Sequence, residues 1–177
     1  MLTPIINFAL ALGISMNFFT FAQNSEMQLK GRALAPVITF MLMQIILFII
    51  GWGLAQLLAG LVEGNEQTLY TALLAVIGFK RMVRFFTTKK ETRSFVVREM
   101  FSLAGLSLAV AIDSLIFGLG FGLAMSGAGY MVLLLILATL FTSLAGIFLK
   151  QRNSKSYGAI AELISGFLIL AVAIMSF

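Results

Sequence analysis

Six stretches of this sequence are each long and apolar enough to cross a lipid bilayer as a helix. They cover residues 4–22, 34–60, 68–86, 97–124, 129–149 and 157–177. A spanning helix needs about 20 predominantly apolar residues. The sequence therefore predicts an all-α, polytopic membrane protein with six transmembrane helices. Because the connecting loops are short, helices that follow one another in sequence are expected to pack as antiparallel neighbours.

The composition agrees with this fold class and excludes several kinds of site. Hydrophobic residues make up 60% of the 177 positions and charged residues 11%, whereas about a quarter of a soluble domain is charged. The chain contains no cysteine and no histidine, which excludes disulfides, zinc motifs and catalysis by those side chains. No nucleophile–base pair or G-x-S-x-G motif is present, so an enzyme is not expected. The uncharged start lacks a cleavage site, which predicts a retained first helix rather than a signal peptide.

The basic residues predict how the chain is oriented. All 12 lysines and arginines lie in or beside the first, third and fifth loops, and the second loop carries Glu63 and Glu66 instead. The positive-inside rule then places loops one, three and five in the cytoplasm and both termini outside. The basic positions are Lys30, Arg32, Lys80, Arg81, Arg84, Lys89, Lys90, Arg93, Arg98, Lys150, Arg152 and Lys155. This distribution is a topology signal, so a lipid bilayer and not a nucleic acid is the expected partner. An oligomer remains possible.

A polar linker over residues 87–94 divides a single membrane domain into two three-helix halves, 1–86 and 95–177. A shift of 96 residues places Ser15-Met16-Asn17 on Ala111-Ile112-Asp113, and one gap then places Gln44 on Thr139 and Gly51 on Gly146. Since each half has an odd number of helices, the second half would be inverted relative to the first. Inverted repeats are a transporter architecture with the substrate site near the bilayer midplane. Chance similarity between apolar helices is the competing explanation.

Polar residues inside the apolar segments are the candidate site. Asp113 is the one acid deep within any segment, and an ionisable group there is costly and usually functional. Asn17 and Gln44 offer neutral oxygens for a cation but equally serve as hydrogen-bond links between helices. Thr139, Thr142 and Ser143 are expected more often to bond their own helix than to act as ligands.

Two further charged residues are candidates for coupling or gating. Glu162 lies near the start of the sixth segment, where it is expected to extend toward Lys155 or Arg152. The basic residues of the third segment can extend to the membrane surface. Arg81 can instead neutralise a buried acid in an empty site.

Small residues mark expected contact points between helices. Gly118 and Gly122 are spaced as a close-packing ridge, although they also permit a break in the helix near the site. Gly51, Gly53 and Gly146 are expected to be packing points as well.

Five short segments together resemble the manganese efflux pump family (MntP-like), a branch of the LysE-type exporter superfamily. They are Ala11-Leu12-Gly13-Ile14-Ser15-Met16-Asn17, Ile50-Gly51-Trp52-Gly53, Ile77-Gly78-Phe79-Lys80-Arg81-Met82, Ala111-Ile112-Asp113-Ser114 and Ala161-Glu162-Leu163-Ile164-Ser165-Gly166. The resemblance spans nearly the whole chain. It implies gradient-driven export of Mn²⁺ across a bacterial inner membrane, with Mn²⁺ as substrate and no cofactor.

The chain departs from the family pattern in its first half. The family typically has an aspartate where Asn17 stands and a glutamate where Gln44 stands, whereas Asp113 is retained. Mn²⁺ prefers hard oxygen ligands, and one carboxylate does not neutralise it. The expected metal site is therefore Asp113, Asn17, Gln44, Thr139 and Ser143, and three outcomes stay open: weaker Mn²⁺ export, a changed substrate, or a membrane subunit that no longer transports. Export of a small organic solute such as an amino acid is the alternative transport function.

Overall fold

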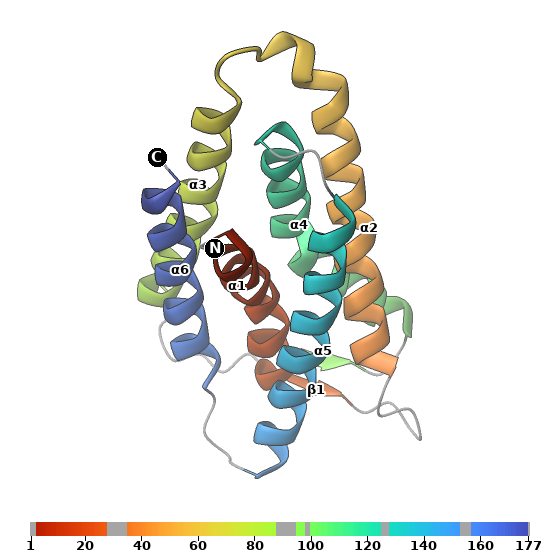
Figure 1. Cartoon of the computed structure of the whole chain (residues 1–177). Coiled ribbons are helices and arrows are strands. Elements are labelled where there is room, and N and C mark those ends of the chain that lie inside the picture. Colours follow the sequence, from red (N-terminus) through yellow and green to blue (C-terminus); the bar gives the residue numbers. More distant parts are fainter. Residues whose placement is uncertain are drawn as a thin grey trace.

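The fold is a bundle of six α-helices joined by short connections (Figure 1). The computed structural model describes residues 3–27, 35–87, 95–97, 100–124, 128–152 and 157–176. The helices in this part of the chain are α1 (Thr3–Asn24), α2 (Ala35–Leu58), α3 (Glu66–Thr87), α4 (Met100–Ala124), α5 (Ala128–Arg152) and α6 (Gly158–Met175), with a 3₁₀ turn η1 (Ala59–Leu61) after α2. The six predicted segments are confirmed as helices, with ends that differ by a few residues. Most of the predicted linker (88–94), and also Lys30, Arg32, Arg98 and Lys155, lie outside the described residues.

Five of the six helices are long and apolar enough to cross a membrane: α1, α2, α4, α5 and α6. Helix α3 has the length, but it carries Glu66, Lys80, Arg81 and Arg84. The chain is therefore a multi-pass membrane protein. Three of the charges on α3, those of Lys80, Arg81 and Arg84, form ion pairs with acids of α4 and α6.

The described surface is apolar and the interior is partly polar, the reverse of a soluble protein. Large side chains such as Leu57, Phe101 and Phe141 are mostly exposed, at 80%, 88% and 68%. Asparagine, glutamine, serine, threonine and charged side chains lie buried between the helices. Lipid can solvate the outer face, whereas buried polar groups must find partners within the protein.

The helices form a closed ring in the order α1, α5, α2, α4, α3 and α6, with α1 and α4 also in contact across it. Among the described residues, α1/α2, α2/α3, α4/α5 and α5/α6 make at most marginal contact. The expectation that consecutive helices pack side by side is thus wrong for these four pairs. Short loops reverse the chain direction, but close packing through small residues selects the partner.

Glycines mark the closest approaches between helices. A Cβ at Gly51 of α2 would collide with the Leu115 carbonyl oxygen of α4, and a Cβ at Gly118 of α4 would collide with that of Phe48. A Cβ at Gly146 of α5 would lie 3.0 Å from the Phe19 carbonyl oxygen of α1. These packing points are confirmed, and α4 continues without a break through the glycine ridge. Gly53 has nothing within 4 Å of its Cβ position, so the expectation for that residue is wrong.

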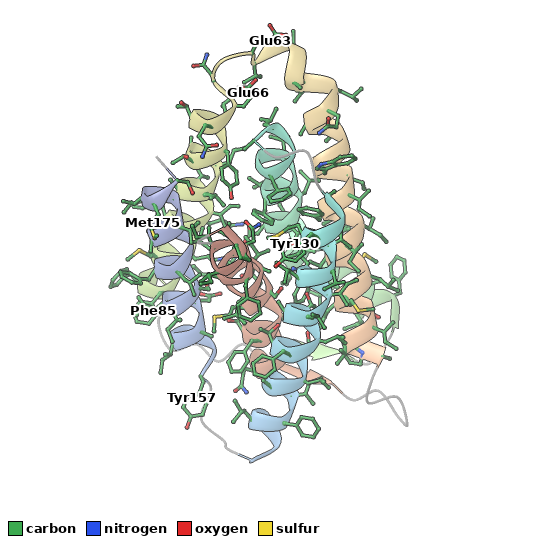
Figure 2. The ribbon with its side chains drawn as sticks, viewed as in Figure 1. Glu63, Glu66, Phe85, Tyr130, Tyr157 and Met175 are labelled. Atoms are coloured by element: carbon green, nitrogen blue, oxygen red, sulfur yellow. The ribbon has the colours of Figure 1, made fainter. Side chains whose placement is uncertain are left out.

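A short pair of parallel strands also forms, which the sequence pattern did not predict. Strand β1 (Ser25–Met27) follows α1 directly and pairs with β2 (Phe95–Val97). Figure 1 shows β1 at the end of the bundle opposite the α2–α3 connection. Figure 2 shows Glu63 and Glu66 at that connection and Tyr157, just before α6, at the other end.

Candidate cation site

Asp113 lies near the middle of α4 with only 2% of its surface exposed. Helix α4 is one of the two helices that contact three others, namely α1, α2 and α3. Its glycine ridge packs on α2, and Asp113 contacts residues of α1 and α3. The ring of helices thereby encloses the carboxylate on the inside of the bundle.

The two oxygens of this carboxylate have different partners. Oδ1 accepts one hydrogen bond, from Lys80 Nζ at 2.6 Å. Oδ2 accepts from Asn17 Nδ2 at 2.8 Å and from Arg81 Nε and Nη2, each at 3.3 Å. We refer to Asp113, Asn17, Lys80 and Arg81 as the carboxylate cluster.

Arg81 is held firmly in the interior. Its side chain is 1% exposed, and its guanidinium also donates to the backbone carbonyls of Gly13 and Ile14 on α1, the latter at 3.0 Å. A guanidinium suits this position because it stays charged and directs several donors in one plane. The prediction that Arg81 can neutralise a buried acid agrees with this geometry, and its predicted role in gating stays a prediction.

Asn17 contributes an unused acceptor to the cluster. Its amide nitrogen donates to Asp113 Oδ2 and, at 3.3 Å, to the Val110 carbonyl. Both partners are acceptors, which fixes the amide orientation, since the opposite flip would bring oxygen against oxygen. Asn17 Oδ1 is buried and has no hydrogen-bond partner. It is therefore available as a neutral ligand beside the carboxylate.

A second buried group, which we call the amide cluster, consists of Gln44, Ser15 and Thr139. Gln44 donates to Ser15 Oγ at 2.9 Å and accepts from Thr139 Oγ1 at 2.6 Å, and the two hydroxyls are 3.1 Å apart. Thr142 donates to the Ser15 carbonyl at 3.1 Å and to its own helix. The hydroxyl of the neighbouring Ser143 is buried without a partner. This cluster contains no formal charge.

The predicted ligand set is therefore divided into two groups. Ser15 and Asn17 are two positions apart on α1, which turns them about 200° around the helix axis. Asn17 faces Asp113, whereas Ser15 faces Gln44 and Thr139. Among the described residues, no hydrogen bond joins Gln44, Thr139 or Ser143 to the carboxylate. The structure brings Asn17 to Asp113 and places the other three predicted ligands on the opposite side of α1.

Glu162 has a partner other than those expected. Its carboxylate lies 3.4 Å from Arg84 Nη1 of α3. Lys155 is outside the described residues, and the side chain of Arg152 is not described. Helices α3 and α6 pack closely at Gly78 and Gly166, which brings Glu162 toward α3, and the predicted contact with Lys155 or Arg152 stays a prediction. Its predicted gating role stays a prediction.

The charge of the site limits what it can bind as it stands. One carboxylate faces two cations, Lys80 and Arg81, so the carboxylate cluster carries one net positive charge. The described residues contain no group of three or more acidic, histidine or cysteine side chains that could hold a metal ion. A cation that binds Asp113 while both partners stay in place adds to a cluster that is already positive.

Sequence reasoning missed two members of these clusters. Lys80 was assigned to the topology signal, although it lies seven residues before the end of α3, too deep for a loop residue. Ser15 appears in the repeat alignment and in the first family segment, but not among the candidate site residues. Both could have been found from their positions. Each lies inside a predicted helix, within two residues of a candidate site residue: Lys80 beside Arg81, and Ser15 near Asn17.

Comparison with known proteins identifies the family of this chain. The family model described as "Putative manganese efflux pump" matches residues 26–176. Among curated proteins named "Putative manganese efflux pump MntP", that of Sodalis glossinidius (strain morsitans) is 26% identical over 168 residues, covering 92% of this chain and 86% of that protein. The one from Gloeothece citriformis (strain PCC 7424) is 22% identical, covering 92% and 88%. The one from Methanothermobacter thermautotrophicus (strain ATCC 29096) is 24% identical, covering 93% and 90%. No solved structure matches the chain significantly. The match over most of the chain shows that this protein belongs to the MntP family of manganese efflux pumps.

Proposed function

We propose that this protein exports Mn²⁺, or a closely similar divalent metal, from the cytoplasm across a bacterial inner membrane. The relatives named as manganese efflux pumps support the substrate. The single observation that carries the proposal is Asp113, a buried carboxylate at the contact between the first and second halves of the chain. An acid inside a transmembrane helix is costly to bury and is therefore usually functional.

Contacts between the halves support two inverted repeats. Asn17 bonds Asp113, its equivalent after the 96-residue shift, and Gln44 bonds Thr139, its equivalent after one gap. Gly51 packs on Leu115 of α4, and Gly146 packs on the equivalent Phe19 of α1. Residues near a two-fold axis meet their own equivalents, so this pattern is expected if the halves are related by such an axis. The basic loops support an orientation with both termini outside the cell.

Alternating access would follow from rocking of one half against the other about this contact. A cation entering from the cytoplasmic side would bind Asp113 Oδ1, with Asn17 Oδ1 as a neutral second ligand. In the present conformation Lys80 and Arg81 occupy the carboxylate, so we regard it as a resting state. Hard oxygen donors suit Mn²⁺, but a single carboxylate predicts weaker binding than a site with two or three.

The test is Mn²⁺ tolerance and cellular manganese content in bacteria that lack their own exporter. Expression of the wild-type chain is expected to raise tolerance, and Asp113→Asn is expected to abolish the effect. Asn17→Asp, which adds a carboxylate beside two cations, is a second variant expected to strengthen it. If neither the wild-type chain nor Asn17→Asp lowers cellular manganese, the manganese proposal fails. Wild-type export by Asp113→Ala would remove the site.

A small amino acid is the second candidate substrate, because two cations face one carboxylate. The substrate carboxylate would then bind Lys80 and Arg81, while its ammonium group would bind Asp113. Ligands that bind the folded state raise its melting temperature. A thermal-shift screen of the purified protein separates the candidates: stabilisation by amino acids but not by Mn²⁺ favours this one.

A further inference from the structure

We propose that the Lys80 ammonium group is a built-in competitor of the transported cation, and that the two alternately occupy Oδ1 of Asp113. This inference rests on the proposed function and adds a regulatory residue to the same site. It assigns Lys80 a role in setting the affinity for the cation.

The contacts of the carboxylate separate a fixed oxygen from an exchangeable one. Oδ2 is held by Asn17 and by two nitrogens of Arg81. Oδ1 is held by Lys80 alone among the hydrogen bonds found, at 2.6 Å. An incoming cation therefore gains a carboxylate oxygen by replacing one hydrogen bond rather than three.

Of the two cationic partners, Lys80 is the one able to leave. Its side chain is 44% exposed, compared with 1% for Arg81. Arg81 makes further hydrogen bonds to the carbonyls of Gly13 and Ile14, and these bonds would be lost if it moved. Lysine has a flexible four-carbon stem and can extend along α3 toward the membrane surface.

The exchange leaves Asp113 paired with a cation at every stage. Without Lys80, Asp113 and Arg81 form a neutral pair, so a divalent cation in place of the ammonium raises the net charge of the cluster from one positive to two. Once the cation has left, Lys80 returns and the carboxylate is again doubly paired. Arg81 stays paired with Asp113 throughout the exchange, and an unpaired charge in the membrane interior would be expensive.

Mn²⁺ binding to the purified protein tests the proposal. Bound Mn²⁺ is measured as the loss of the electron paramagnetic resonance signal of the free ion. The apparent affinity for Mn²⁺ is reduced to the fraction of time for which Lys80 leaves Oδ1 free. If Lys80 holds Oδ1 for about nine-tenths of the time, Lys80→Met is expected to bind Mn²⁺ about tenfold more tightly. Lys155→Met makes the same chemical change in a loop predicted on the same side of the membrane and is expected to bind like the wild-type protein. If the wild-type protein binds Mn²⁺ and Lys80→Met binds no more tightly, the inference is wrong while the proposed function stands. If neither protein binds Mn²⁺, the proposed function fails and the inference with it.

A second measurement uses the wild-type protein and therefore does not depend on whether a Lys80 variant folds. The rate of Lys80 modification by a water-soluble amine reagent is followed by mass spectrometry, with and without saturating Mn²⁺. Mn²⁺ is expected to accelerate modification several-fold in the wild-type protein by releasing the amine from Asp113. Protection of Lys80 by Mn²⁺, or an unchanged rate while Mn²⁺ is bound, would overturn the exchange.

Discussion

The carboxylate cluster and the amide cluster lie on opposite sides of α1 and differ in one respect, charge. In the carboxylate cluster, Asp113 is paired with two cations, one of them half-exposed. In the amide cluster, Gln44, Ser15 and Thr139 satisfy one another as neutral donors and acceptors. Each cluster joins the two halves of the chain through a pair of equivalent residues. The pairs are Asn17 with Asp113, after the 96-residue shift, and Gln44 with Thr139, after one gap.

This difference shows what each cluster can do. Hydrogen bonds among neutral groups hold the helices together, and breaking them frees no charged group that could bind a cation. A paired carboxylate can exchange one cationic partner for another. The amides at positions 17 and 44 therefore have different consequences: Asn17 remains beside an acid and its counter-ions, whereas Gln44 remains in a neutral group.

The largest effect is expected from removing Asp113, the acid of the carboxylate cluster. Asp113→Asn leaves Lys80 and the buried Arg81 without a counter-ion, which typically costs about 3–5 kcal/mol. Unfolding in mixed detergent micelles should show this loss, and Mn²⁺ export should vanish. The control is Asp113→Asn combined with Arg81→Gln, expected to regain much of the stability but no export. Export by this double variant would show that the cluster is structural.

A smaller loss is expected from placing an acid in the neutral cluster. Gln44→Glu buries a carboxylate where the described residues offer no cation, at a cost of about 2–4 kcal/mol or a proton taken up instead. Its stability should therefore fall as the pH rises, because only the protonated form is tolerated. The same micelle assay at several pH values measures this. A stable, pH-independent Gln44→Glu protein would mean that a counter-ion reaches the amide cluster.

The matched change in the charged cluster is expected to be tolerated. Asn17→Asp brings a second carboxylate beside Lys80 and Arg81, so the net charge of the cluster falls from one positive to zero. We expect a change in stability of less than about 1 kcal/mol and Mn²⁺ binding about tenfold tighter, which corresponds to about 1.4 kcal/mol. The binding assay described for Lys80 measures it. Weaker binding would show that Asn17 is not a ligand.

The smallest effect is expected from removing neutral bonds between the halves. Gln44→Leu and Thr139→Val should each destabilise the protein by about 0.5–1.5 kcal/mol, with a coupling of similar size because they share one bond. Unfolding of the two single variants and the double variant measures that coupling, and Mn²⁺ export should persist in all three. A folded variant that no longer exports would place the amide cluster in the cation path.

Part of the site could be predicted from the sequence because the residues that carry it stand out along the chain. Asp113 is an acid within an apolar segment, and the constant shift between the halves pointed to Asn17 as its partner. The split of the ligand set could not be predicted, since it depends on the rotation of α1 between α4 on one side and α2 and α5 on the other. The partner of Glu162 was likewise decided by the close packing of α3 on α6.

The sequence by itself determined the number of helices, their extents and the candidate acid, because in a bilayer each helix satisfies its backbone within its own segment. Which helices touch was decided only in three dimensions, where glycines on α2, α4 and α5 let distant segments approach closely. The charge state of the site was decided there as well. In the sequence Lys80 is a basic residue of the topology signal, and Arg81 is either that or the counter-ion of a buried acid. The packing of α3 on α4 brings both to Asp113, because a buried carboxylate needs its counter-ions close by.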